Sequence, residues 1–287
     1  MVVSNTLEMN DKNSEHYVIY DGKKVIVEDG LLSLCLDSGD VQSLTEIKGL
    51  KDLTELKTLE IIAYPLRRID NLDNLTSLEQ LTIIGSEYLD KIENLENLTN
   101  LRRLDLSGCE ITEISGLENL KNLEYLQFGD GEFGGNNITE INGISSLTNL
   151  KKLILSYNKI TEIKGFDTLY NLKELCLDNN KITEIKGLDT LYNLKELCLD
   201  VNKITEIKGL ENLINLKIFS AFGNQIREIK GLDSLQNLEF LDLGGNEIKE
   251  IYGVANLPNL KTLSLRGNRF GYNSIKAIGS TNFKIEY

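Results

Sequence analysis

The string DTLYNLKELCLD occurs twice in this chain, at residues 167–178 and 189–200, so the second copy begins 22 residues after the first. A catalytic motif works as a single constellation and gains nothing from a copy at fixed spacing, so the repetition indicates a structural unit used in series. The pattern extends as the template LxxLxLxxNxIxEIxGLxxLxN. Eleven units begin at Leu31, Leu56, Leu78, Leu101, Leu123, Leu150, Leu172, Leu194, Leu216, Leu238 and Leu260.

Packing physics accounts for the template. The LxLxL alternation predicts a short strand whose leucines point to one side. The later isoleucines and leucines of each unit fold back over the same interior. One such coil cannot offset the conformational entropy of ordering its own backbone, so neighbouring coils must stack and share strand hydrogen bonds. The unit at Leu123 has five extra residues, in GDGEFGGNN, which are expected in a loop.

The template resembles the leucine-rich-repeat family over residues 31 to 270, and it is most similar to the short-repeat subclass typified by the regulatory subunit of protein phosphatase 1. The resemblance implies an α/β repeat fold that is mostly strand. We expect a right-handed solenoid with a parallel concave β-sheet and 3-10 or irregular segments on the convex side. Residues 1–30 would form an N-terminal cap, residues 31–259 ten coils, and residues 260–287 the last repeat and a C-terminal cap.

An asparagine follows the strand of each later unit, and its side chain is expected to turn inward and satisfy backbone groups where the chain bends. It is present as Asn136, Asn158, Asn180, Asn202, Asn224, Asn246 and Asn268. The earlier units offer Gly39, Tyr64, Ser86 and Cys109 instead, so the N-terminal third should be less regular. Residues 16–30 indicate two short strands around Asp-Gly, which would cap the N-terminal end.

Charge and cysteine content limit the classes of partner and the compartment. The 44 acidic residues against 31 basic ones give a net charge of -13, which would repel nucleic acid and anionic membranes. No secretory signal or membrane span is visible in the sequence. Four cysteines are too few for a disulfide framework in a chain of this length, so we expect the protein in the reducing cytoplasm. We also expect a monomer.

Sequence signals for chemistry are weak throughout the chain. GDGEFG satisfies G-x-G-x-x-G, but the next coil follows it where a nucleotide site needs a helix. The same segment lacks the ligand spacing of a calcium loop. His16 is the only histidine, and Cys176 and Cys198 are expected to be free thiols on neighbouring strands. We therefore predict no catalytic residue, no cofactor and no metal ligand set, and the chain is not expected to be an enzyme.

The strand residues that point away from the core should line one continuous concave face. Apolar residues there are exposed and surround an acidic strip of Glu174, Asp178, Glu196 and Asp200, an arrangement that is typical of interaction sites. Ordinary solubility, with one acidic coil copied by duplication, is the alternative explanation of the strip. The predicted partner-binding residues are Tyr125, Lys152, Ile154, Tyr157, Glu174, Asp178, Glu196, Asp200, Phe222 and Phe240.

These observations favour a non-enzymatic scaffold or regulatory subunit that binds a protein with a basic or mixed surface. The resemblance to the phosphatase regulator implies a phosphatase catalytic subunit as one such partner. The alternative is an internalin-like cell-surface adhesin. Internalins share the repeat length, but they usually carry a proline where this chain has Lys-Gly or Ser-Gly, and an adhesin would need an export signal.

Overall fold

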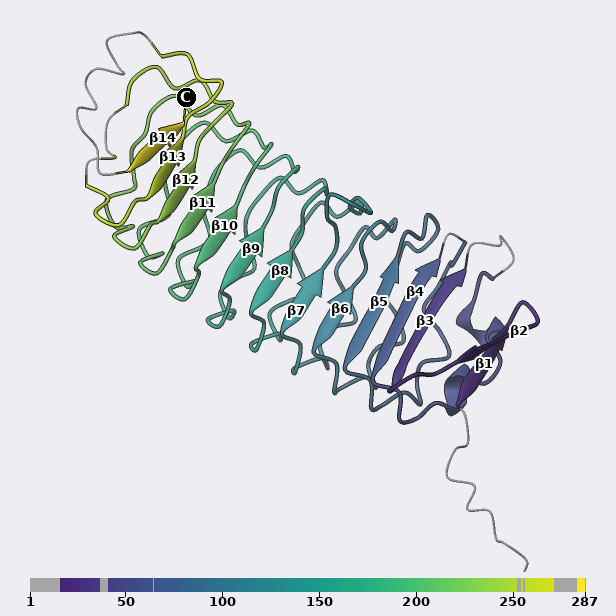
Figure 1. The fold of residues 1–287 in the computed structure, drawn as a ribbon. Coiled ribbons are helices and arrows are strands. Elements are labelled where there is room, and N and C mark those ends of the chain that lie inside the picture. The colour runs from purple at the N-terminus through teal and green to yellow at the C-terminus, as the bar shows by residue number, and fades with distance from the viewer. Residues whose placement is uncertain are drawn as a thin grey trace, which may run out of the picture.

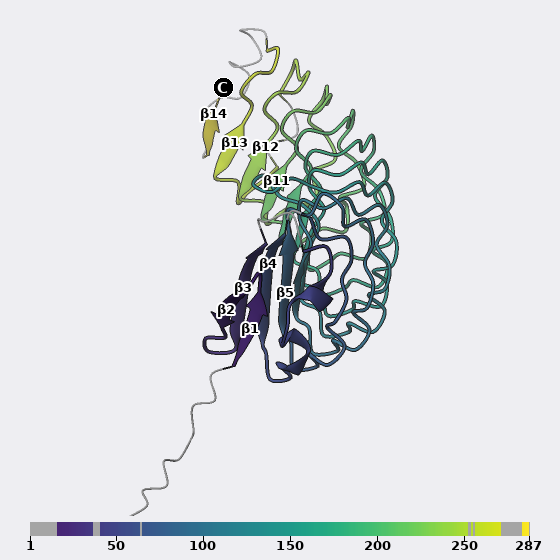
Figure 2. The same ribbon diagram turned by 90° about the vertical axis from the view of Figure 1, so that its right-hand side faces the viewer.

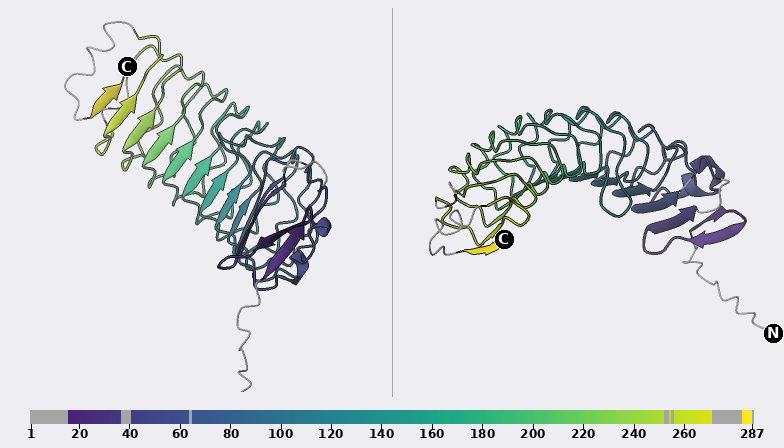
Figure 3. Two further views of the ribbon diagram at one scale, coloured as in Figure 1. Left: turned by 45° about the vertical axis from the view of Figure 1, so that its right-hand side comes forward. Right: turned by 90° about the horizontal axis from the view of Figure 1, so that it is seen from above.

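The computed structural model describes residues 16–36, 41–63, 65–251, 254, 256–270 and 283–286. Most of these residues belong to one curved solenoid whose strands lie side by side along its inner, concave side (Figure 1 and Figure 3). The parallel sheet has twelve strands in chain order. They are β3 (Leu31–Leu36), β4 (Thr58–Ala63), β5 (Gln80–Ile84), β6 (Arg103–Asp105), β7 (Tyr125–Gln127), β8 (Lys152–Ile154), β9 (Glu174–Cys176), β10 (Glu196–Cys198), β11 (Ile218–Ser220), β12 (Phe240–Asp242), β13 (Thr262–Ser264) and β14 (Lys284–Glu286).

The strands pair in the register that the template predicts. Glu174, Leu175 and Cys176 of β9 lie opposite Glu196, Leu197 and Cys198 of β10, and the pairs from β4 to β13 follow the same rule. Residues that share a template position therefore form columns that run across the sheet. This confirms the parallel-sheet solenoid. Figure 2 shows the strands on one side and the turns and loops of the coils on the other.

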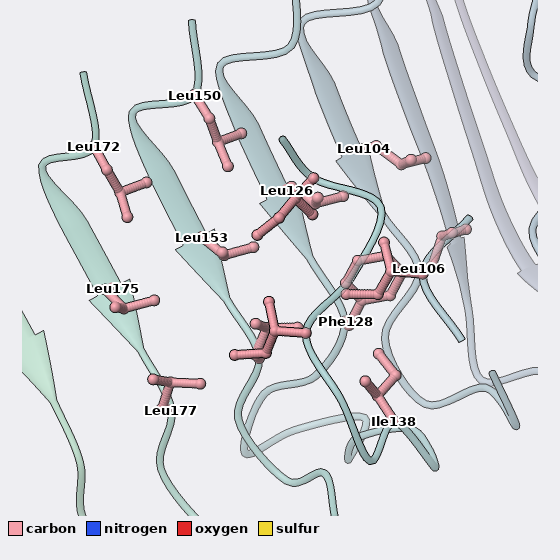
Figure 4. Close-up of a cluster of buried hydrophobic side chains, with 14 of the residues drawn as sticks. Leu104, Leu106, Leu126, Phe128, Ile138, Leu150, Leu153, Leu172, Leu175 and Leu177 are labelled. Carbon is pink, nitrogen blue, oxygen red and sulfur yellow. The ribbon is translucent and has the colours of Figure 1, made fainter. Parts of the chain in front are cut away.

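The core lies between the strands and the returning half of each coil. The strand leucines, such as Leu153, Leu155 and Leu175, are fully buried. Phenylalanine takes a leucine position in three coils, at Phe128, Phe166 and Phe219, and all three rings are fully buried. Figure 4 shows this packing for the coils around Phe128, whose ring lies near Leu106 and Ile138. Stacked coils thus share one continuous apolar interior, as the energetics of a single coil require.

The asparagine of each later coil ties neighbouring coils together. The Asn180 amide nitrogen donates to the carbonyl oxygens of Leu155, Leu177 and Asp178 at 2.9, 3.0 and 3.1 Å. Its side-chain oxygen accepts the N–H of Ile160 at 2.9 Å. The same pattern recurs at Asn202, Asn224 and Asn246. The prediction that these side chains satisfy backbone groups at the bend is confirmed.

The N-terminal part of the sheet differs from the later coils. Strands β3 to β5 are five or six residues long, against three residues in β6 to β14. Ser86 donates to the carbonyl of Leu66, and the Cys109 thiol contacts the carbonyl of Ile83 at 3.7 Å, so both take over part of the asparagine's role. Gly39 and Tyr64 lie outside the described residues.

The unit predicted to begin at Leu31 is displaced by two residues. Leu32 pairs with Leu59 and Leu34 with Ile61, so Asp29 occupies the position of the first leucine and Leu31 itself is 39% exposed. A strand that alternates buried and exposed residues keeps the same faces after a shift of two, which is why the pattern concealed the shift. Strand β14, paired parallel to β13, is a further strand that the eleven units did not include.

The N-terminal end carries an antiparallel hairpin, β1 (Tyr17–Tyr20) and β2 (Lys23–Ile26), around Asp21 and Gly22. Two 3-10 helices follow, η1 (Leu44–Glu46) and η2 (Leu50–Asp52). Val18 of the hairpin is fully buried against the core. Across the described part of the chain, no helix is long and apolar enough to cross a membrane.

Candidate binding surface on the concave sheet

The predicted binding residues fall into two groups on the concave face. The first group shares the third template position and includes Tyr125, Lys152, Glu174, Glu196 and Phe240, which occupy successive places in one column with Ile218. The second group lies at the carboxyl ends of the strands and includes Ile154, Tyr157, Asp178, Asp200 and Phe222. We call the first group the strand column, and the second surrounds a hollow in the face.

This hollow, which we call the central depression, is an open cavity of about 430 Å³. All five residues of the second group line it, together with Asp130, Gly131, Ser156, Cys176, Asn179 and Val201. Tyr157, Val201 and Phe222 are 43, 46 and 43% exposed. Three large side chains, from the ends of β8, β10 and β11, therefore surround a hollow that is also lined by three aspartates.

The backbone of Tyr157 and Val201 is unusual. Both residues are in the left-handed region, with φ of 56° and 52°. The same template position carries Asn179 and Gly223, residue types that tolerate this conformation. A β-branched residue there is a conformational outlier, with a cost of roughly 1–2 kcal/mol. Val201 therefore carries local strain on the surface of the depression, and such strain is often stored at functional sites.

The duplicated coils make the position of Val201 informative. Residues 167–188 and 189–210 are identical except that the first has Asn179 where the second has Val201. Asparagine fits the left-handed turn and valine does not. The single difference between two otherwise identical coils thus exchanges a favourable polar residue for a strained apolar one that faces solvent.

Asp178 and Asp200, two of the three aspartates that line the depression, are held by the chain itself. Asp178 accepts the N–H of Asp200 at 2.8 Å, and Ser156 donates to its other oxygen at 3.4 Å. Asp200 accepts the Ser220 hydroxyl at 2.5 Å and the N–H of Phe222 at 2.8 Å. These bonds fix the turn that presents Phe222. The acidic strip therefore has a structural role in addition to any binding role.

Burial changes the charge that the two aspartates present. Desolvation raises the pKa of Asp178 to about 6, although its hydrogen bonds favour the charged form. Desolvation also raises the pKa of Asp200, and the bonds from Ser220 and Phe222 oppose that change. A cation or basic side chain in the depression would relieve this cost.

The strand column is more fully paired within the chain. Lys152 forms an ion pair with Glu174 at 2.5 Å, and this contact raises the pKa of Lys152. The Glu196 carboxylate accepts a hydrogen bond from the Cys198 thiol at 3.6 Å. The Arg103 guanidinium lies 3.5 Å from the centre of the Tyr125 ring, and the Tyr125 hydroxyl donates to Gln127. Phe240 is half-buried beside Ile218.

The insertion GDGEFGGNN forms a compact turn at the edge of the depression. The Asp130 carboxylate accepts the N–H groups of Glu132 and Phe133 at 2.9 and 2.8 Å and an amide hydrogen of Gln127 at 2.9 Å. The side chain of Asp130 is thus used to close the turn. Gly135 lies so close to Tyr157 that a Cβ atom would come within 1.5 Å of its carbonyl oxygen, so the insertion supports the Tyr157 backbone.

Sequence reasoning missed two features of this site. Val201 is not among the predicted binding residues, and the left-handed turn at its position was not recognised. The glycines and asparagine at the same position in neighbouring coils were the available signal. The hydrogen bonds from Ser156 to Asp178 and from Ser220 to Asp200 were also not predicted, because the place of these serines is visible only in the folded coils.

A family model of leucine-rich repeats, which covers two copies, matches residues 99–146, 148–190, 170–212, 212–256 and 236–282. No curated protein matches the chain.

Among solved structures, an internalin, InlF from Listeria monocytogenes str. 4b F2365, is 27% identical with a TM-score of 0.69, and the match covers 90% of this chain and 79% of that chain. Internalin C2 from the same strain is 32% identical with a TM-score of 0.60, and the match covers 67% of this chain and 82% of that chain. TLR13, solved as a complex with ssRNA13, is 27% identical with a TM-score of 0.68. That match covers 79% of this chain and 34% of TLR13.

Proposed function

The chain belongs to the leucine-rich-repeat family, and we propose that it is a non-enzymatic scaffold whose concave face binds another protein. The observation that carries this proposal is the central depression, where Tyr157, Val201 and Phe222 expose nearly half of their surface around half-buried aspartates that include Asp178 and Asp200. Exposed aromatic and apolar groups with polar neighbours are typical binding anchors. The strained backbone of Val201 supports a role beyond solubility.

The chemistry of the depression favours a partner with a basic or mixed surface. An apolar side chain of the partner would pack between Tyr157 and Phe222, and a lysine or arginine beside it would meet Asp178 and Asp200. Such a cation restores the charge that burial disfavours in these aspartates. Charge complementarity would set the orientation, and the apolar anchors would supply most of the affinity.

A protein partner agrees better with the charge of this chain than a nucleic acid does. The TLR13 complex contains single-stranded RNA, so the fold itself does not decide between the two classes. The present chain has a net charge of -13 and carboxylates in the depression. Phosphate binding depends on lysine and arginine that neutralise the backbone, so RNA is the less favoured ligand.

The partner class, the oligomeric state and the compartment can also be proposed. A phosphatase catalytic subunit remains a predicted partner on the basis of the repeat type, and we propose that the protein acts as a monomer in the cytoplasm. The four cysteines are too few for a disulfide framework, and this supports a reducing compartment. An internalin-like surface adhesin stays the second candidate because InlF and internalin C2 match most of the chain. Detection of the native protein outside intact cells would favour the adhesin.

Affinity capture from the native cell, followed by mass spectrometry, tests the proposed surface. Wild type should retain a protein that the double variant Tyr157→Ala/Phe222→Ala loses at least about tenfold, because two anchors are removed. Ile214→Ala is a matched control, since Ile214 is 52% exposed but lies in the turn that precedes β11. Equal recovery of every partner by wild type and the double variant would remove the assignment.

A further inference from the structure

Two cysteines and one aspartate form a cluster at the central depression: Cys176 and Asp178 line the depression, and Cys198 lies beside Cys176 on the next strand. Cys176 of β9 lies directly opposite Cys198 of β10, and Asp178 follows Cys176 at the end of the same strand. One thiol or carboxylate atom of each residue lies within 4.8 Å of the corresponding atoms of the other two. The 22-residue repeat predicts that the two thiols lie on neighbouring strands, and the structure adds the Asp178 carboxylate to them.

The spacing of these atoms suits a tetrahedral metal ion. Zinc binds thiolate sulfur at about 2.3 Å and carboxylate oxygen at about 2.0–2.2 Å, which places two ligand atoms roughly 3.5–3.8 Å apart. Small side-chain rotations from the present separations would reach these values. Two thiolates select a soft or borderline ion, and the carboxylate favours zinc over a purely thiophilic ion such as Cu(I).

The surroundings of the cluster also suit a cation. Asp178 accepts a hydrogen bond from the N–H of Asp200 at 2.8 Å. This bond fixes the orientation of the carboxylate, as hydrogen-bond partners of metal ligands commonly do. Its other oxygen has a longer contact of 3.4 Å with the Ser156 hydroxyl. Glu196 is beside Cys198, and Asp200 lines the same depression, so the local charge attracts cations.

We propose that Cys176, Asp178 and Cys198 bind one zinc ion in the concave face, with the fourth coordination position open to the central depression. Three protein ligands with an open fourth position leave room for water or for a side chain of a bound partner. This inference goes beyond partner binding, because the site would exist in the protein alone.

The other two cysteines do not contribute to this site. Cys109 is buried and its thiol contacts the carbonyls of Ile83 and Ser107 at 3.7 and 3.6 Å. Cys35 is exposed on β3, far along the sheet from β9. Cys35 therefore serves as a matched control for removal of a thiol.

Titration of the reduced full-length chain with Co²⁺ as a spectroscopic substitute for zinc tests the site directly. We expect about one bound ion per chain, with thiolate-to-cobalt charge transfer and the visible bands of a tetrahedral ion. Cys176→Ser and Cys198→Ser should each weaken binding at least about tenfold and reduce the charge-transfer intensity. Asp178→Asn should weaken binding and keep both thiolate contributions, and Cys35→Ser should leave the spectrum unchanged.

A competing zinc titration gives a second readout, because an ion that binds only the folded protein raises Tm. Zinc should raise the Tm of wild type and of Cys35→Ser, but not that of Cys176→Ser or Cys198→Ser. Circular dichroism of each variant checks that it folds before metal is added. Absence of cobalt binding, or binding that survives both serine substitutions, would overturn the site. Neither result depends on a partner, so the proposed protein-binding function is tested separately.

Discussion

At the scale of single residues, stability and binding favour different side chains at the left-handed backbone position shared by Asn179 and Val201. Asn179 and Val201 occupy equivalent positions in identical coils, with φ of 53° and 52°. Asparagine adopts this conformation readily, whereas valine is strained there. A residue that costs stability and exposes apolar surface is better explained by binding than by folding.

Val201→Asn should therefore stabilise the protein by about 1 kcal/mol, because it removes the left-handed strain. The reciprocal variant Asn179→Val should destabilise it by a similar amount. Denaturant unfolding measures both changes. Val201→Asn should at the same time weaken capture of the partner, since it removes an anchor. A loss of stability in Val201→Asn would show that the valine is held there by packing and not by function.

Asp105 gives a pH dependence that can be isolated by substitution. Desolvation raises its pKa above 3.8, although Ser107 donates to its carboxylate at 2.7 Å. A carboxyl with a raised folded-state pKa contributes stability that is fully present below the unfolded-state pKa. That contribution is lost as the pH rises through the folded-state pKa. Wild-type stability should therefore fall relative to Asp105→Asn as the pH rises from about 4, the ordinary pKa of an aspartate, through the raised folded-state pKa.

Free energies of unfolding of wild type and Asp105→Asn, measured at several pH values in this range, test the prediction. Other carboxylates titrate in both proteins and cancel in the difference. A difference that stays constant with pH, or that changes in favour of wild type as the pH rises, would contradict the assignment of a raised pKa to Asp105.

At the scale of elements, the inward asparagine decides whether neighbouring coils stay in register. Asn180→Ala would remove the acceptor for the buried N–H of Ile160 and the donor for the Leu155 carbonyl. Each buried group left without its bond costs about 1–3 kcal/mol, so we expect a loss of about 3 kcal/mol in the free energy of unfolding.

Asn193→Ala is the matched control for this loss. Asn193 also donates to the preceding coil, at 2.8 Å to the Tyr170 carbonyl, but it is exposed. Water can replace that bond, so we expect a change below about 1 kcal/mol. Equal effects of the two substitutions in denaturant unfolding would remove the special role of the inward asparagine.

The sequence was a good predictor of these elements where the template is regular. From Leu56 to Leu260 the spacing of leucines placed each strand and column correctly, because burial on one face fixes the register. It was wrong by two residues in the first coil, where Asp29 replaces the leading leucine. Strand β14 was missed because KIE lacks the leucines of the template, and its pairing with β13 depends on the end of the solenoid.

At the scale of the whole molecule, the stacked coils place equivalent residues of successive repeats side by side on one surface. Residues 22 positions apart become neighbours, so a change in one coil alters one place on a continuous face. The list of outward residues could be predicted from this rule. The contacts that these residues make within the chain could not be predicted. The ion pair of Lys152 with Glu174 and the hydrogen bonds to Asp200 depend on which side chains meet across coils. The neighbouring positions of Cys176 and Cys198 were predicted, but the approach of the Asp178 carboxylate to the two thiols was not.

Site-specific photo-crosslinking in the native cell tests most directly whether the concave face binds a protein. A photoreactive amino acid would replace Tyr157 or Phe222 in the depression, and Ile214 as the exposed control outside it. We predict that positions 157 and 222 crosslink to the same protein and that position 214 does not. Crosslinking of that protein from position 214 alone, or no specific crosslink from positions 157 and 222, would contradict the account.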